Sequence, residues 1–306
     1  MNKKYILLNL FVIILMCLSP KISKGQIILD DSVLHGNNFE KAAFRLWLNA
    51  DTKIIRGVIV LVPGSNGDGR DMVKDTAWQN LANRHNMALL ACYYKDNPGK
   101  NMAIEKYADV KKGSGQAMLD VLQIFSQKSK HAELNNAPLA FWGASAGGEF
   151  NYEFVCWKPE RVIAFIVNKG GVYYSSLAPE AAREVPGVFF VGEKDSPFRN
   201  NIIKGIFSIN RRFGAKWIFV EESGVAHEFS NSAKFARVFF DEIIPLRIPD
   251  IAEGLSQAMK NLPSVGYIAK IKSKQIAPEV KNKRINEITS WFPNKQLAEA
   301  WLDFIR

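Results

Sequence analysis

The fold is decided by one stretch, Leu139-Ala140-Phe141-Trp142-Gly143-Ala144-Ser145-Ala146-Gly147-Gly148-Glu149-Phe150. Its first four residues are apolar, as in a buried strand, and its last two open a segment that we expect to be helical. Small residues fill the junction between the two, and a serine lies at its centre. The stretch therefore predicts a strand that turns abruptly into a helix, with Ser145 at the bend.

The glycines around Ser145 have the spacing of a nucleophile elbow. In such an elbow the serine is held on a strained turn, and side chains on its neighbours would clash. Gly143 and Gly147 carry no side chains. Because the pattern Gly-x-Ser-x-Gly also occurs in ordinary turns between a strand and a helix, it indicates a nucleophile only together with other residues.

The segments on both sides of this junction predict an α/β protein. After an opening pair of short strands, which should pair antiparallel at a sheet edge, strand and helix patterns alternate. Such alternation predicts an eight-stranded, mostly parallel sheet with helices on both faces. The expected helices cover residues 78–85, 117–126, 149–157, 201–212 and 233–244, the last stopped by Pro245. The expected strands cover residues 27–34, 42–48, 57–62, 87–93, 139–142, 162–167, 188–191 and 217–220.

The chain changes character from residue 247 onward. Prolines interrupt the pattern, a short strand is expected at residues 266–271, and a last helix should begin after Pro293. A core built from this part alone would be too small to fold independently. We therefore predict a main domain at residues 26–246 and a small C-terminal appendage, residues 247–306, packed on it.

Residues 1–25 have the pattern of a secretory signal peptide. A basic start leads into an apolar run that ends at Leu18, and the small-residue exit Ser23-Lys24-Gly25 follows. The run is too short for a membrane-spanning helix. A lipid anchor on Cys17 is disfavoured, because large residues precede it where small ones are expected. Cleavage near Gly25 would make the mature protein periplasmic or secreted.

Charge and cysteine content exclude several classes of function. The net charge of +10 falls to +6 when the signal peptide is removed, because that segment holds four lysines and no acidic residue. The remaining basic residues are scattered and include no basic motif interleaved with aromatic residues, so no nucleic-acid partner is expected. Cys92 and Cys156 lie in apolar segments and are expected to be buried free thiols rather than a disulfide. No cysteine and histidine spacing suggests a metal site.

A nucleophilic serine needs a base and, usually, a carboxylate that orients the base. Of four histidines only His227 follows the elbow, in a glycine-bearing loop just past the strand expected at residues 217–220. Asp195 is the only aspartate between Ser145 and His227, and it follows the strand expected at 188–191. Glu193 is the alternative acid. Carboxyl ends of parallel strands meet at one edge of a sheet, so these residues are expected to converge there.

The chain resembles the α/β-hydrolase family over residues 27–244. The elbow, the acid turn with Asp195 and the loop with His227 follow the family's order of serine, acid and histidine. The resemblance implies an oxyanion hole made by the amide of Ala146 and by an amide of the loop after residues 57–62. Many family members have His-Gly where this chain has Pro63-Gly64, so the second donor is left open between Gly64 and Ser65. Within the family the chain looks similar to feruloyl esterases, polyhydroxyalkanoate depolymerases and dienelactone-hydrolase-like proteins.

These residues imply a serine hydrolase that cleaves carboxylic esters, without metal or cofactor. Only the short region 173–184 lies between the strands expected at 162–167 and 188–191, so no large insertion is expected to cover the site. An open site suits a small-molecule or polymer-linked ester, including an ester of a carbohydrate. We also predict that the substrate is contacted by Tyr94, Tyr173 and Tyr174. A serine peptidase, an acyltransferase, or a catalytically silent protein with the same fold are the alternatives. The oligomeric state is not predicted.

Overall fold

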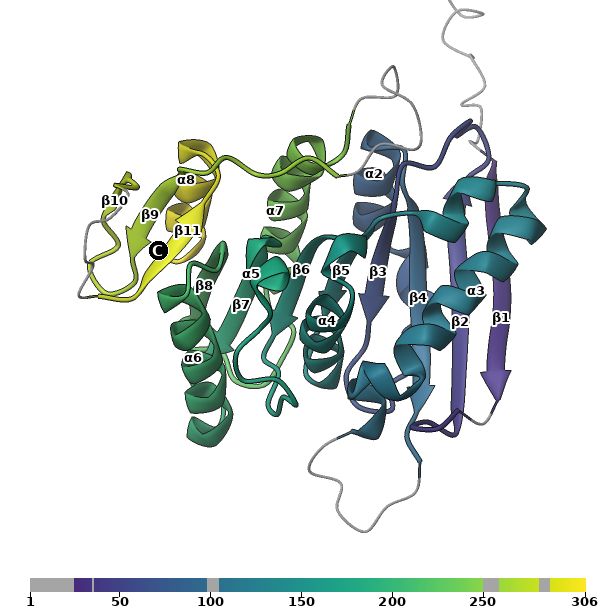
Figure 1. The fold of residues 1–306 in the computed structure, drawn as a ribbon, viewed down its shortest axis with the longest axis horizontal. Coiled ribbons are helices and arrows are strands. Elements are labelled where there is room, and N and C mark those ends of the chain that lie inside the picture. Colours follow the sequence, from purple (N-terminus) through teal and green to yellow (C-terminus); the bar gives the residue numbers. More distant parts are fainter. Residues whose placement is uncertain (1–24, 35, 98–104, 250–258, 281–286) are drawn as a thin grey trace, which may run out of the picture.

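The computed structural model describes residues 25–34, 36–97, 105–249, 259–280 and 287–306. An eight-stranded sheet with the order β1-β2-β4-β3-β5-β6-β7-β8 forms the centre of the molecule (Figure 1). The predicted signal peptide, except Gly25, lies outside the described residues. Within the described ranges, no helix is both long enough and apolar enough to cross a membrane.

The sheet is mostly parallel, as predicted. β1 pairs antiparallel with β2, and β2 pairs antiparallel with β4, while all other neighbours in the sheet run parallel. Four of the central strands are buried along their whole length, which explains why they appear in the sequence as continuous apolar runs. The strands are β1 (Gln26–Leu34), β2 (Lys41–Asn49), β3 (Val58–Val62), β4 (Ala88–Lys95), β5 (Leu139–Gly143), β6 (Val162–Asn168), β7 (Gly187–Gly192) and β8 (Trp217–Glu222).

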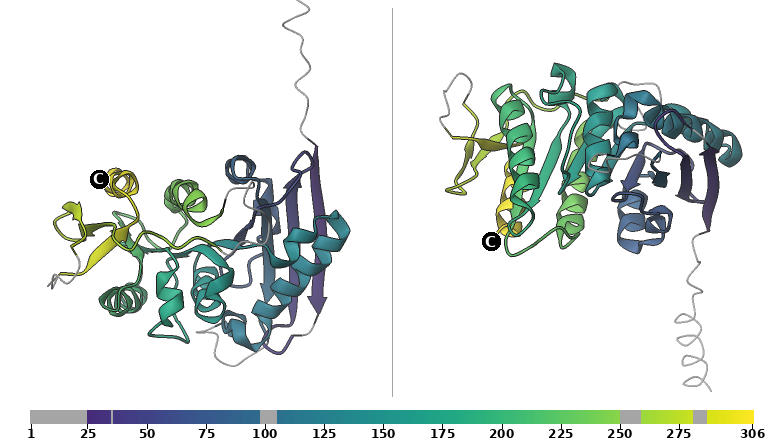
Figure 2. Two further views of the ribbon diagram at one scale, coloured as in Figure 1. Left: turned by 45° about the horizontal axis from the view of Figure 1, so that its top comes forward. Right: turned by 90° about the horizontal axis from the view of Figure 1, so that it is seen from below.

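Helices cover both faces of the sheet, and each face has its own hydrophobic core (Figure 2). One core is closed by α3 (Ser114–Ser129), α4 (Ala146–Trp157), α5 (Glu180–Glu184) and α6 (Pro197–Arg212). The other is closed by α2 (Thr76–Arg84), α7 (Ser232–Arg247) and α8 (Lys295–Phe304). Short 3-10 helices join these elements: η1 (Arg70–Lys74), η2 (Lys106–Ala108), η3 (Val110–Lys112), η4 (Ala132–Asn136) and η5 (Pro159–Arg161).

The C-terminal part forms a second, three-stranded antiparallel sheet beyond β8. Its order is β10 (Ile276–Pro278), β9 (Tyr267–Lys270) and β11 (Thr289–Phe292). The sequence predicts one strand here, and the other two are missed because three or four residues carry too little pattern without their partners. The indole N–H of Trp301 in α8 donates to the carbonyl oxygen of Phe219 in β8 at 2.8 Å, and Ser290 Oγ accepts the Phe219 amide at 2.9 Å. The division at residue 247 stays a prediction.

Pro245 does not end α7. The helix continues to Arg247, although proline lacks the N–H group that a helix interior requires. The guanidinium of the buried Arg247 donates to the carbonyl oxygens of Lys260 at 2.8 Å and Val162 at 3.3 Å. These hydrogen bonds hold the last turn of α7 in place. Because their acceptors lie outside the helix, the local sequence around Pro245 does not predict them.

The two described cysteines agree with the prediction. Cys92 lies in β4 and Cys156 in α4, and both are buried and unpaired. Burial raises the pKa of the Cys156 thiol to about 12, and it also raises the pKa of the Cys92 thiol well above its usual value. Both side chains therefore stay protonated near neutral pH and act as small apolar groups.

Candidate active site

Ser145 lies on a sharp turn between β5 and α4, as the sequence predicts. Its φ of 53° and ψ of −128° place it in a region that residues with a Cβ atom rarely adopt. A Cβ atom at Gly143 would lie 2.5 Å from the carbonyl oxygen of Gly147. A Cβ atom at Gly147 would lie 2.5 Å from the carbonyl oxygen of Pro63. Both glycines are therefore needed for the turn to form.

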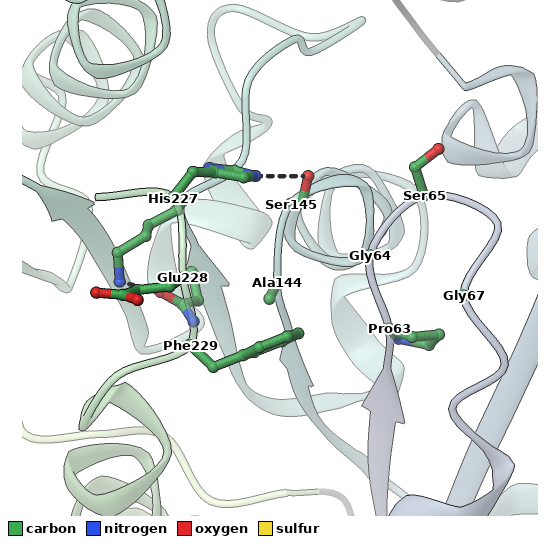
Figure 3. Close-up of a pocket in the computed structure, with 11 residues that line it drawn as sticks. Pro63, Gly64, Ser65, Gly67, Ala144, Ser145, His227, Glu228 and Phe229 are labelled. Carbon is green, nitrogen blue, oxygen red and sulfur yellow. Dashed lines mark hydrogen bonds between the residues drawn. The ribbon is translucent and has the colours of Figure 1, made fainter. Parts of the chain in front are cut away.

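The structure brings Ser145, His227 and Asp195 together at the carboxyl ends of β5, β7 and β8. The Nε2 atom of His227 lies 3.1 Å from Ser145 Oγ, and its Nδ1 atom lies 2.8 Å from Asp195 Oδ2. Figure 3 shows the imidazole ring of His227 pointing at the hydroxyl of Ser145. The Asp195 side chain is only 3 % exposed, whereas that of His227 is 39 % exposed. This arrangement suits proton transfer from the serine to an imidazole that is oriented by a buried carboxylate.

The alternative acid, Glu193, has a different position. Its Oε2 atom accepts a hydrogen bond from the Gly224 amide at 2.6 Å and from Ser223 Oγ at 2.8 Å. These bonds lower the pKa of the Glu193 carboxyl below its usual range. Glu193 therefore holds the start of the loop that carries His227, and Asp195 is the carboxylate that accepts the hydrogen bond of the imidazole Nδ1–H group.

The three amides named for the oxyanion hole lie around Ser145. Ala146 is the first residue of α4, and Gly64 lies so close that a Cβ atom there would be 3.5 Å from Ser145 Cβ. Among the described residues, the amides of Ala146, Gly64 and Ser65 have no hydrogen-bond acceptor. The Ser65 side chain points away from Ser145 (Figure 3), so only its main chain could take part. The choice between Gly64 and Ser65 stays open.

A pocket of about 350 Å³ opens at Ser145. Its walls include the loop after β3, the elbow, the end of β6 and the segment from His227 to Phe229. The Phe229 ring is 52 % exposed and stacks on Trp142, with 5.8 Å between ring centroids. Among the described residues, no cluster of three or more histidine, cysteine, aspartate or glutamate side chains could hold a metal ion.

Solved structures with a similar fold are numerous. They include a ferulic acid esterase (TM-score 0.54, 12 % identity, covering 73 % of this chain and 99 % of that chain). Poly(aspartic acid) hydrolase-1 from Sphingomonas sp. KT-1 is similar too (TM-score 0.52, 15 % identity, covering 71 % of this chain and 98 % of that chain). So is the poly(3-hydroxybutyrate) depolymerase LpqC from Bordetella parapertussis (TM-score 0.50, 16 % identity, covering 75 % of this chain and 92 % of that chain). The protein has the α/β-hydrolase fold. The sequence matches no protein-family model and no curated protein.

None of the three tyrosines predicted to bind substrate lines the pocket. Tyr94 is 2 % exposed, its ring stacks on Tyr107, and its hydroxyl donates to the Ser114 carbonyl oxygen at 2.8 Å. The prediction that Tyr94 binds substrate is therefore wrong, because its side chain faces the core side of β4. Tyr173 and Tyr174 lie in the loop after β6 and are not part of the pocket wall. Their role in binding stays a prediction.

Two further histidines have structural partners. His85 Nε2 lies 2.6 Å from Asp241 Oδ1, and His131 Nδ1 lies 2.9 Å from Glu133 Oε1. Neither lines the pocket. Of the histidines in the described residues, His227 is the one that lies at the pocket and contacts Ser145.

The pocket residues that sequence reasoning misses include Asn168 and Lys169. Asn168 is the last residue of β6 and Lys169 follows it, at the same carboxyl edge of the sheet as the other site residues. Lys169 is 2 % exposed and its ammonium group pairs with the buried carboxylate of Glu222. A lysine that immediately follows a buried strand was a signal available in the sequence, by the same rule that selects Asp195.

Glu149 is a buried carboxyl one helical turn after Ser145. It is 4 % exposed, and its Oε1 atom accepts the Val172 amide at 3.0 Å. Its other oxygen has no hydrogen-bond partner among the described residues. Burial raises the pKa of Glu149 from 4.5 to about 7. The folded protein therefore binds this proton more tightly than the unfolded chain does.

The Glu149→Gln variant should gain stability relative to the wild type as the pH rises. Because the folded-state pKa is raised, the stabilisation from this proton is present below about pH 4.5 and is lost as the pH approaches 7. Between about pH 5 and about pH 8 the difference in unfolding free energy should move by roughly 2 kcal/mol in favour of the variant. Urea unfolding at both pH values measures it, with the exposed Glu160→Gln as control. Parallel profiles for the wild type and Glu149→Gln would contradict this prediction.

Proposed function

We propose that the protein is a serine hydrolase that cleaves carboxylic esters through an acyl-enzyme on Ser145. The observation that carries the proposal is the unbroken line of hydrogen-bond distances from Ser145 Oγ through His227 to the buried Asp195. Ser145 lies on a strained elbow that exposes its hydroxyl to a pocket. The fold is also that of an esterase, a polymer hydrolase and a depolymerase, which supports hydrolysis as the reaction class.

In the proposed reaction, Ser145 Oγ attacks the ester carbonyl carbon while His227 Nε2 takes the hydroxyl proton. Asp195 keeps the proton of the imidazole on Nδ1 and stabilises the imidazolium that forms. The amide of Ala146, with that of Gly64 or Ser65, donates to the tetrahedral oxyanion. His227 then gives its proton to the departing alcohol, which leaves the acyl group on Ser145. Water, activated by His227, releases the acid and restores the serine.

The open setting of the site supports a small-molecule or polymer-linked ester as substrate. The His227 side chain is 39 % exposed, and the pocket wall contains loop residues rather than a covering helix. A polymer chain can reach such a site from solvent, whereas a buried tunnel would admit only a free chain end. No metal or cofactor takes part in the proposed mechanism.

Hydrolysis of short p-nitrophenyl esters tests the proposal, with Ser145→Ala as the background control. Turnover of the esters but not of peptide p-nitroanilides supports an esterase, and the reverse result supports a peptidase. An acyltransferase would transfer the acyl group to an added alcohol in preference to water. If the protein turned over neither kind of substrate and were not labelled by a fluorophosphonate, the result would support a catalytically silent binding protein with this fold.

We also propose that the protein is exported and that cleavage near Gly25 removes the predicted signal peptide. The first described strand, β1, begins directly after this position, at Gln26. Mass spectrometry of the protein from its native host should therefore find a mature chain that begins near Gln26. An intact Met1, or a lipid on Cys17, would contradict export by this route.

A further inference from the structure

A buried ion pair lies behind the proposed active site, and the proposed mechanism does not use it. Lys169 follows β6 and Glu222 ends β8, with side chains that are 2 % and 4 % exposed. The Lys169 ammonium group donates to Glu222 Oε2 and, at 3.1 Å, to Asn168 Oδ1. A buried pair adds little net stability, because both charges lose their hydration. Its presence beside the site requires another explanation.

The backbone at Lys169 is unusual as well. Its φ of 52° lies in the left-handed region, which a residue with a Cβ atom rarely adopts. Lysine is also among the residues least often buried. Its main-chain amide donates to the Phe190 carbonyl oxygen at 3.0 Å, which extends the pairing of β6 with β7. The chain thus adopts a disfavoured conformation at a position where it buries a charge.

Asn168 connects Lys169 to the elbow and to the loop that carries the proposed base. Its main-chain oxygen accepts the amide of Ser145 at 2.8 Å. Its side-chain oxygen accepts from Lys169, and its side-chain amide donates to Ser232 Oγ at 2.8 Å. The Ser232 hydroxyl donates in turn to the carbonyl oxygen of Phe229 at 2.5 Å. One buried asparagine therefore holds both the elbow with Ser145 and the loop with His227, the two partners of the hydrogen bond between serine and imidazole.

Glu222 and Lys169 make the matching connection to the acid turn. The main-chain oxygen of Glu222 accepts the amide of Glu193 at 3.0 Å. A Cβ atom at Gly192 would lie 3.1 Å from Lys169 Cε and 2.5 Å from the carbonyl oxygen of Ala226. The lysine stem therefore lies against the point where the acid turn meets the base loop.

We propose that Lys169 is a positioning residue for the hydrolytic reaction, acting through Asn168 and Glu222. This inference rests on the proposed function. A single ammonium group binds acceptors at the ends of two strands, β6 and β8, and so fixes the three loops that hold Ser145, Asp195 and His227 relative to one another. A misplacement of about 1 Å between reacting groups can lower a rate about 100-fold. The buried pair would keep Ser145 Oγ and His227 Nε2 within hydrogen-bond distance.

The double variant Lys169→Met/Glu222→Gln tests the proposal. Methionine keeps the unbranched stem and glutamine keeps the shape of the carboxylate, while both charges disappear together. A single substitution would leave an unpaired buried charge and would destabilise the protein for that reason alone. The kcat on p-nitrophenyl acetate should fall about 10- to 100-fold with KM changed less than about twofold. Circular dichroism at the assay temperature verifies that the variant is folded.

The neighbouring residue in β8 supplies a matched control. Glu221 pairs with Lys204 at 2.8 Å, but both side chains are nearly half exposed. The variant Lys204→Met/Glu221→Gln likewise removes one lysine charge, here from α6, and one glutamate charge from β8. Its kcat should stay within about twofold of the wild type. If the buried double variant does not fold, Asn168→Ala replaces it, because this change breaks the same connection and keeps the ion pair. It should show the same fall in kcat.

A second measurement separates this inference from the proposed function. The imidazole Nδ1 proton shared by His227 and Asp195 should give a far-downfield NMR signal, which Asp195→Asn should abolish. Loss of the Lys169 and Glu222 charges should shift this signal, whereas the Lys204 control should not. A wild type that turns over no ester would refute the proposed function, and the NMR comparison would still decide the positioning role. A folded buried variant with wild-type kcat, or with an unchanged signal, overturns the inference.

Discussion

Replacing Ser145 by alanine should lower kcat on a good ester substrate by about 10⁴- to 10⁶-fold, and His227→Ala should cost a similar factor. The reason is geometric: the hydroxyl and the Nε2 atom of the imidazole lie 3.1 Å apart, so the base is useful only to this nucleophile. KM should change little, because neither side chain mainly binds substrate. Steady-state kinetics on p-nitrophenyl esters measures both effects.

The two losses should not add. Once the base is gone the serine is inactive, so the double variant Ser145→Ala/His227→Ala should be about as slow as either single variant. His131→Ala is a matched control, since its imidazole pairs with Glu133 outside the pocket. Wild-type turnover by Ser145→Ala would show that the nucleophile is wrongly assigned.

Asp195→Asn should lower kcat by about 10⁴-fold, again with little change in KM. The carboxylate accepts the proton on His227 Nδ1 at 2.8 Å and is almost fully buried, so it holds the ring in the tautomer that leaves Nε2 free to accept. An asparagine amide can instead donate to Nδ1, which favours the tautomer with its proton on Nε2. That ring cannot take the serine proton.

Glu193→Gln is the control for the acid. Glu193 accepts hydrogen bonds from Ser223 and Gly224, while the imidazole is hydrogen-bonded to Ser145 and Asp195, so the variant should keep most of its activity. The acid would be reassigned if Glu193→Gln were nearly inactive while Asp195→Asn were not. Measuring the two variants with the same substrate and pH makes the comparison direct.

The parts of this structure that the sequence could predict are those with a local signal. The burial of central strands requires continuous apolar runs, and the elbow requires glycine at 143 and 147 because a Cβ atom would meet the main chain there. The positions of Asp195 and His227 after strand ends were sufficient to bring them to one edge of a parallel sheet. The fold and the convergence of these groups can therefore be predicted from local patterns and from the order of strands and helices along the chain.

The parts that could not be predicted depend on contacts between distant residues. Whether Tyr94 faces the core or the pocket depends on how β4 sits beside α4 and η2, which no local pattern reports. The ion pair between Lys169 and Glu222 joins residues 53 positions apart. The place of each residue at a strand end can be predicted, but their pairing cannot. The strands β10 and β11 both pair with β9, and β11 is also hydrogen-bonded to β8, so their formation depends on residues outside their own short segments.

The measurement that tests the central claim most directly is mass spectrometry after labelling with a fluorophosphonate, which reacts with activated serine hydroxyls. The folded wild type should gain one adduct, and digestion should place it on the peptide that contains Ser145. Ser145→Ala should gain none, and His227→Ala should react far more slowly, because the hydroxyl then lacks its base. A folded wild type that gains no adduct, or an adduct that persists in Ser145→Ala, would contradict the assignment of Ser145 as the nucleophile.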